Sequence, residues 1–223
     1  MKISFVLSLV SLEPRDTLLR VNDATSPNFA AMKAVRDELF ADTTLPLYAE
    51  RTANKMFPVI GEGSHEAKIM FIGEAPGKNE AATGRPLCGA SGRILDAVMA
   101  HIGFDRKTAY VTNLVKDRPP GNRDPLPEEI AAYGPLLDRQ VATIHPTVIA
   151  TLGRFSMAYI MEKCGLAAEL QSISKIHGHV FESKTDYGPK YVVPLYHPAV
   201  AAYSPSMIEV LKKDAEALKA LLK

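Results

Sequence analysis

Cysteine is scarce in this chain of 223 residues, which has only Cys88 and Cys164. Two thiols exclude a disulfide framework, and they exclude any site that takes four cysteine ligands from one chain. Tryptophan is absent, and no apolar run reaches the roughly 18 residues that a membrane-spanning helix needs. Lys and Arg number 26 against 25 Asp and Glu. Because the charges balance, nucleic-acid binding would have to come from a local basic patch.

The composition is that of a globular protein, with 47% hydrophobic and 23% charged residues, and it excludes a disordered or fibrous chain. The first ten residues form a short apolar segment with one lysine, but no small-x-small cleavage site follows them. We therefore expect an edge strand or an ordered arm here rather than a signal peptide, and a cytoplasmic protein that does not bind membranes.

Short apolar stretches alternate with segments whose apolar residues recur at helical spacing. The predicted strands are Lys68–Gly73, Thr108–Val115, Thr147–Leu152 and Tyr191–Tyr196. The predicted helices are Asn28–Phe40, Ser91–Ile102, one from Pro127 to about Ile144, one that begins near Arg154, and Met207–Leu222. Strands separated by helices form parallel sheets covered on both faces. We therefore predict an α/β fold: one domain over residues 41–223 with a central, mainly parallel four-stranded sheet flanked by helices on both sides, preceded by an N-terminal arm and helix, residues 1–40, packed on the core.

Three unusual segments follow the predicted strands, where open α/β sheets bind ligands. They are residues 73–80, 113–123 and 197–200. Each is a weak signal alone, because tight turns and solvated loops also carry such residues. Since the carboxyl ends of parallel strands meet at one edge of the sheet, the three together predict a site there.

Individual side chains in these segments fit a site, although each has a plainer interpretation. Glu74 lies between a strand and a rigid Ala-Pro-Gly turn, which would fix its position in a site. The plainer interpretation is a solvated glutamate at the surface. Asn113 lies in an apolar strand, where its buried amide must bond either a ligand or a neighbouring loop. His197 precedes a proline that holds its backbone extended and aims its ring, or it is a histidine satisfied at a strand end.

Four linked segments resemble the family 4 uracil-DNA glycosylases in order and spacing, from about Leu45 to the C-terminus. They are Gly73-Glu74-Ala75-Pro76-Gly77, Thr83-Gly84-Arg85-Pro86-x-x-Gly89-x-x-Gly92, Thr112-Asn113-x-Val115-Lys116-x-Arg118-Pro119-Pro120-Gly121-Asn122-Arg123 and His197-Pro198-Ala199. The resemblance implies a monofunctional DNA glycosylase that flips uracil out of DNA and hydrolyses its N-glycosidic bond. It also implies a prokaryotic, nucleoid-associated monomer whose partner is uracil-containing DNA, single- or double-stranded.

The resemblance assigns roles to particular residues. Asn113 matches the asparagine that reads the base, and His197 matches the histidine that donates to uracil O2 as charge gathers there. Ala75 stands beside the base where other uracil-DNA glycosylases keep a water-directing aspartate. Either Glu74 or Glu80 is then the residue that places the water.

The chain departs from the family at the cysteines that hold a 4Fe–4S cluster. Asp42, Leu45, Asp117 and Tyr133 stand at the four ligand positions. We therefore expect no cluster and no other cofactor.

Other contacts would have to join the segments that the cluster joins in the family. The alternatives are an apolar contact, an ion pair, or cover from residues 1–40. The apolar contact would involve Leu45, Leu47 and Tyr133, and the ion pair would join Asp42 or Asp117 to Arg51, Arg118 or Arg139.

The base wall and the DNA contacts also depart from the family. Leu87 stands where the family has a phenylalanine that stacks on the base. The loss of that ring favours weaker binding of the base or a pocket that accepts a different base. Tyr203 is a candidate wedge for the vacated base position, or an ordinary packed tyrosine. The predicted DNA contacts are Lys116, Arg118, Arg123, Lys175, His177, Val200 and Tyr203.

Three functions therefore remain open. The first is uracil excision. The second is a homologue that binds lesions or single strands with weak or no catalysis. The third is a glycosylase for another deaminated base such as hypoxanthine.

Overall fold

The computed structural model describes residues 26–222, so the prediction for the first ten residues lies outside the described part. A six-stranded sheet has the order β1-β3-β2-β4-β6-β5. The strands are β1 (Glu62–Gly63), β2 (Ile69–Gly73), β3 (Tyr110–Asn113), β4 (Val148–Leu152), β5 (Phe181–Glu182) and β6 (Tyr191–Leu195). The inner four strands pair in parallel, as predicted. The two edge strands pair antiparallel and were not predicted, because two residues are too few to show a pattern.

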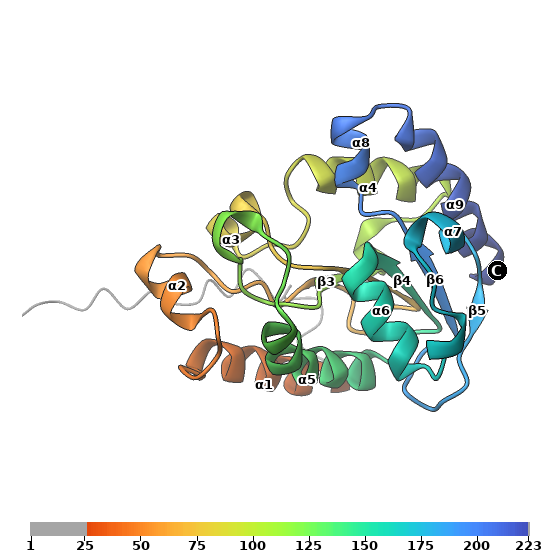
Figure 1. Cartoon of the computed structure of the whole chain (residues 1–223). Coiled ribbons are helices and arrows are strands. Elements are labelled where there is room, and N and C mark those ends of the chain that lie inside the picture. The colour runs from red at the N-terminus through yellow and green to blue at the C-terminus, as the bar shows by residue number, and fades with distance from the viewer. Residues whose placement is uncertain (1–25, 223) are drawn as a thin grey trace, which may run out of the picture.

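Helices cover both faces of the sheet, as predicted (Figure 1). They are α1 (Pro27–Ala41), α2 (Tyr48–Ala53), α3 (Lys78–Thr83), α4 (Ala90–His101), α5 (Pro127–Ile144), α6 (Arg154–Lys163), α7 (Ile173–Ile176), α8 (Ala199–Tyr203) and α9 (Met207–Leu221). Short 3₁₀ turns lie at Arg106–Thr108, Pro120–Asn122 and Ala167–Glu169.

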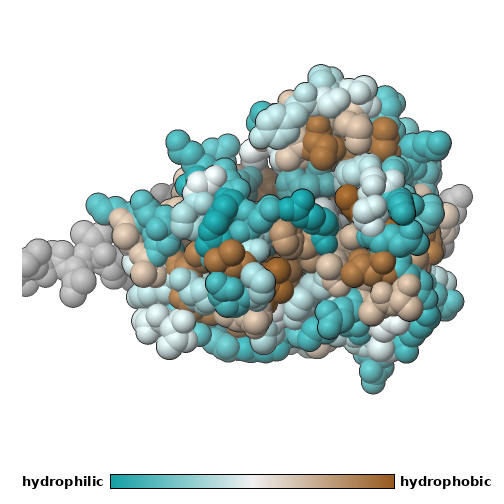
Figure 2. All heavy atoms as spheres, in the orientation of Figure 1, coloured by the Kyte–Doolittle hydropathy of each residue, from teal (hydrophilic) through white to brown (hydrophobic). Residues whose placement is uncertain are grey.

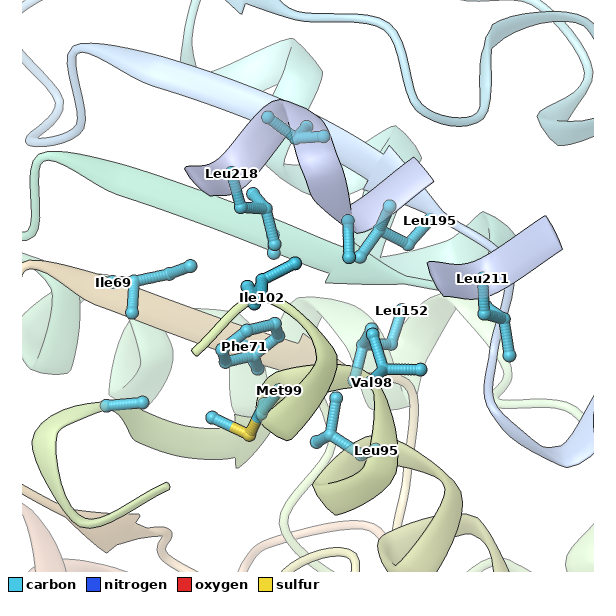
Figure 3. Packing of buried hydrophobic residues seen from close by; sticks show 14 of the residues in the cluster. Ile69, Phe71, Leu95, Val98, Met99, Ile102, Leu152, Leu195, Leu211 and Leu218 are labelled. Atoms are coloured by element: carbon cyan, nitrogen blue, oxygen red, sulfur yellow. The ribbon is translucent and has the colours of Figure 1, made fainter. Parts of the chain in front are cut away.

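Successive residues of β2 point to opposite faces, and all five are buried. Ile69 and Phe71 face α4 and α9, where they meet side chains such as Val98 and Leu218 (Figure 3). Met70 and Ile72 face the other side, where α5 and α6 pack. Cover on both faces explains why the central strands are almost wholly apolar.

The predicted helix in the N-terminal region is present as α1. Ser26 caps it, because its side-chain oxygen accepts a hydrogen bond from the Asn28 N–H at 3.1 Å, and Pro27 occupies the first turn. α1 lies along α5 (Figure 1) and buries Met32, Val35 and Leu39 there.

The parallel register brings the carboxyl ends of the strands to one edge. Gly73 of β2 pairs with Asn113 of β3. Beyond the strands, the Val115 N–H donates to the Glu74 carbonyl at 2.9 Å, and the Gly153 N–H donates to the Leu195 carbonyl at 3.0 Å. These bonds hold the connecting segments together at the edge where the site was predicted.

Candidate active site

A pocket of about 330 Å³ lies at this edge of the sheet. Its volume falls in the roughly 300–1,000 Å³ range of ligand sites. In Figure 2 the surface is hollowed between the regions of α3 and α8. All three predicted segments contribute to its wall. The predicted residues that line it are Glu74, Ala75, Glu80, Leu87, Asn113, Arg123, His197 and Tyr203.

Asn113 ends β3 with its side chain in the pocket wall and is 2% exposed. Its Nδ2 has no hydrogen-bond partner among the described residues. Gly73 leaves room for this amide, because a Cβ there would lie 2.3 Å from Asn113 Oδ1. A buried donor without a partner costs about 1–3 kcal/mol, so this end of the amide lowers stability and is free to bond a molecule in the pocket.

His197 follows β6 and is held as a neutral ring. Its Nδ1 accepts a hydrogen bond from the Ala199 N–H at 3.2 Å, so the ring hydrogen is on Nε2. Burial lowers the pKa of His197 to about 4, and the charge of Glu80 opposes the shift only in part. At neutral pH the ring therefore offers an uncharged Nε2–H donor.

Glu74 is anchored at the N-terminus of α6. Its Oε1 accepts a hydrogen bond from the Phe155 N–H at 3.0 Å. Burial raises the pKa of Glu74, although this hydrogen bond and the charge of Arg154 oppose the shift. Gly153 is needed here, because its φ is +105° and a Cβ would lie 2.4 Å from Glu74 Oε1.

One carboxylate oxygen of Glu80 accepts hydrogen bonds from the backbone of a pocket loop. Its Oε1 accepts from the N–H groups of Cys88 and Gly89 at 3.0 and 3.1 Å. These bonds hold Leu87 in the wall, 4% exposed and with a left-handed φ of +42°.

The prediction that Lys116 contacts DNA is wrong. Its side chain is completely buried, and its Nζ donates to three oxygens inside the protein. The sequence showed a basic residue in a loop, but the chain turns inward after β3. A phosphate cannot reach this ammonium group.

The other predicted basic contacts lie at the surface or partly exposed. Arg118 Nε donates to Asn122 Oδ1 at 2.6 Å, and Arg123 pairs with Glu129 at 2.5 Å. Lys175 is exposed. His177 Nδ1 lies 2.7 Å from Asp214 Oδ2. Only Arg123 among them lines the pocket.

Tyr203 and Val200 lie on α8, close after His197. Tyr203 is 90% exposed and lines the pocket, so it is not an ordinary packed tyrosine. Val200 is half-buried and packs against the core cluster of α4 and α9 instead.

At the positions that match the family's four cluster ligands, this chain forms other contacts. Asp117 is 1% exposed, accepts from Tyr133 Oη at 2.6 Å and pairs with Arg51 Nη1 at 3.1 Å. Leu45 and Leu47 pack in the same hydrophobic cluster as Tyr133. Thus both an apolar contact and an ion pair join these segments.

Of residues 1–40, the described part adds Val35 and Leu39 of α1 to this hydrophobic cluster. Asp42 and Arg139, which were considered for the ion pair, have other partners. The Asp42 carboxylate accepts from Thr44 instead of an arginine, and Arg139 pairs with Glu38 of α1. Iron–sulfur clusters are held by thiolates, and the residues here supply carboxylates, a phenol and an aliphatic side chain. This donor set does not fit a 4Fe–4S cluster.

Several features of the site could not be found by sequence reasoning. Asp124 and Pro125 also line the pocket, just beyond the predicted segment 113–123. Gln140, which bonds Lys116, lies far along the chain on α5. No local pattern relates these residues, because the fold alone brings them together.

The chain is similar to known proteins over most of its length. A family model described as "Uracil DNA glycosylase superfamily" matches residues 60–222. The chain is 40% identical over 192 residues to a type-4 uracil-DNA glycosylase of Sulfurisphaera tokodaii, covering 86% of this chain and 84% of the relative. It is 45% identical over 166 residues to that of Saccharolobus solfataricus, covering 74% and 76%, and 34% identical over 194 residues to that of Thermotoga maritima, covering 86% and 95%. In the described part of the chain, no helix has the length and apolar character to cross a membrane. The chain belongs to the uracil DNA glycosylase superfamily and is related to its type-4 members.

Proposed function

We propose that this protein is a monofunctional DNA glycosylase that removes uracil from DNA and leaves an abasic site. The observation that carries the proposal is that two hydrogen-bond donors line one pocket. They are Nδ2 of Asn113, which has no partner among the described residues, and the neutral Nε2–H of His197. The type-4 relatives support the choice of uracil.

Asn113 reads the base after it has been flipped from the stack. The amide oxygen accepts from uracil N3–H, and Nδ2 donates to uracil O4. Cytosine presents an acceptor at N3 and a donor at C4, so the same amide orientation rejects it. The unpaired state of Nδ2 without substrate is what this role requires.

His197 and Glu74 assist the bond cleavage. The bond between sugar C1′ and base N1 breaks with its electron pair remaining on uracil, where charge gathers at O2. The Nε2–H of His197 stabilises that charge, and one such donor contributes about 3–4 kcal/mol to the transition state. Water then adds to the oxocarbenium-like C1′ and gives up a proton, and the uracil anion takes up a proton from solvent, so that neutral uracil and an abasic site result. Glu74 stabilises this cation and orients the water, because its position at the helix terminus is fixed.

Glu80 serves the same site indirectly. Because its Oε1 is bound to two backbone N–H groups, its role is to hold the Leu87 loop. This assignment separates the two glutamates that the sequence left as alternatives.

DNA is held around the mouth of the pocket. Tyr203 fills the position that the flipped base vacates, and Arg118, Arg123, Lys175 and His177 contact phosphates. Such contacts position the duplex without reading its sequence. The catalytic residues need no cofactor, and the Arg51–Asp117–Tyr133 network holds the segments that a cluster would join.

The proposal is tested with oligonucleotides that carry uracil, hypoxanthine or xanthine, followed by alkaline cleavage at abasic sites. We expect uracil to be excised fastest, and His197→Ala and Asn113→Ala to lose most of the rate. His101→Ala and Asn54→Ala, at exposed positions away from the pocket, are the matched controls.

The other outcomes correspond to the alternatives. If the protein bound the modified oligonucleotides but cleaved none of them, it would be a lesion-binding protein rather than an enzyme. Faster excision of hypoxanthine than of uracil would make the protein a glycosylase for hypoxanthine. Leu87 favours this alternative, because it lacks an aromatic face to stack on the base.

A further inference from the structure

Lys116 is completely buried three residues after Asn113, an unusual place for a lysine. Its Nζ donates to Thr112 Oγ1 at 2.8 Å, to the Asn113 carbonyl oxygen at 2.7 Å and to Gln140 Oε1 at 2.5 Å. All three donors of the ammonium group are thus used. Two of the three acceptors belong to the last two residues of β3.

A second layer of hydrogen bonds fixes these acceptors. Thr112 Oγ1 and Gln140 Nε2 both donate to the carbonyl of Ile60, each at 2.8 Å. The carbonyl of Lys116 itself accepts from the Val59 N–H at 2.7 Å. The end of β3 is therefore tied to α5 and to the segment that precedes β1.

This arrangement is costly for stability alone. Burial lowers the pKa of Lys116 well below its usual value. The acceptors are neutral oxygens, and no ion pair to Lys116 exists within the described residues. A methionine of similar length would fill the space without the cost of removing an amine from water. The position therefore points to a function for the amine.

The function of the Lys116 amine follows from the way in which the side chain of Asn113 is held. Since its Nδ2 has no partner in the described part of the chain, hydrogen bonds do not aim this end of the amide. Its position depends on its backbone, which the pairing with Gly73 holds on one side and Lys116 holds at the carbonyl.

We propose that Lys116 is a positioning residue for base recognition, which fixes the backbone of Asn113 so that the amide meets the uracil edge. The inference rests on the proposed function. It assigns Lys116 to the reaction without contact to substrate, in place of the phosphate contact that its charge indicated.

The test is a double-mutant cycle between Lys116→Met and Asn113→Ala, with kcat/KM for uracil excision and the melting temperature measured for each variant. A displacement of a reacting group by about 1 Å costs roughly 10²-fold in rate, so Lys116→Met is expected to lose about that factor. When Asn113 is already alanine, the same substitution should cost no further activity, and the melting temperature shows separately what it does to stability.

Met161→Ala is the matched control, because Met161 is completely buried on α6 and does not line the pocket. It should lower the melting temperature and leave kcat/KM unchanged at temperatures where the protein is folded. If Lys116→Met does not fold, Thr112→Val replaces it, with Thr112→Ser as the control that keeps the hydroxyl acceptor. Thr112→Val should then lose activity and Thr112→Ser should not.

Losses that add in the double variant, or equal activities of Thr112→Val and Thr112→Ser, would overturn the role of Lys116 while the wild type still excises uracil. A wild type that excises no uracil would overturn the proposed function instead. The two failures are thus distinguishable.

Discussion

Asp117→Ala tests whether the buried polar network holds together the segments that a metal cluster would otherwise join. The substitution leaves Arg51, 4% exposed, without its carboxylate, and it removes the acceptor of Tyr133 Oη. Breaking a buried ion pair by removing one partner costs about 3–5 kcal/mol. At roughly 2–4 °C per kcal/mol for a protein of this size, the melting temperature should fall by roughly 6–20 °C.

Two comparisons make this prediction specific. The exposed pair of Arg139 and Glu38 is the control, and Arg139→Met should lower the melting temperature by a few degrees at most. Replacing the whole network by Arg51→Met, Asp117→Leu and Tyr133→Phe should restore most of the stability, because apolar residues fill the space without buried charge. Thermal unfolding followed by circular dichroism measures all three. A loss for Asp117→Ala no greater than that for Arg139→Met would refute the reasoning.

Three further predictions concern the pocket. Excision should not rise as the pH falls through 6.5, the usual pKa of histidine, since His197 has a pKa of about 4. It should fall in acid as Glu74 takes up a proton, and this fall should begin at a higher pH than for an ordinary glutamate because burial raises its pKa. A rate that rises as pH falls through 6.5 would contradict the neutral donor. Leu87→Phe should lower KM for uracil-containing DNA, because stacking on a base contributes about 1–3 kcal/mol; an unchanged KM would show that position 87 does not touch the base. Tyr203→Ala should reduce excision from double-stranded DNA more than from single strands, whereas Tyr203→Phe should not; equal losses on both substrates would exclude a wedge.

The parallel sheet was predictable because its strands are buried on both faces. β2 is a continuous apolar run and β4 is apolar except for Thr151, and both begin and end in the sequence where they do in the structure, within a residue or two. The edge strands β1 and β5 were not predictable, since their pairing depends on partners distant in the chain.

The site was predictable as far as strand ends determine it. Asn113 ends one buried strand and His197 follows another, so the register alone places them at one edge. Lys116 was misplaced, because a charge in a loop is ordinarily solvated and nothing local shows that Gln140 provides an acceptor inside the core. The separate roles of Glu74 and Glu80 likewise depend on the backbone N–H groups that each meets in three dimensions.

The most direct test of the central claim is the rate of free uracil release from a uracil-containing oligonucleotide, measured on a preparation whose iron content is determined in the same sample. The pocket of Asn113, His197 and Glu74 predicts full release at substoichiometric iron, with no effect of a chelator. A rate that rises in proportion to bound iron, or no release by the folded protein, would contradict the claim.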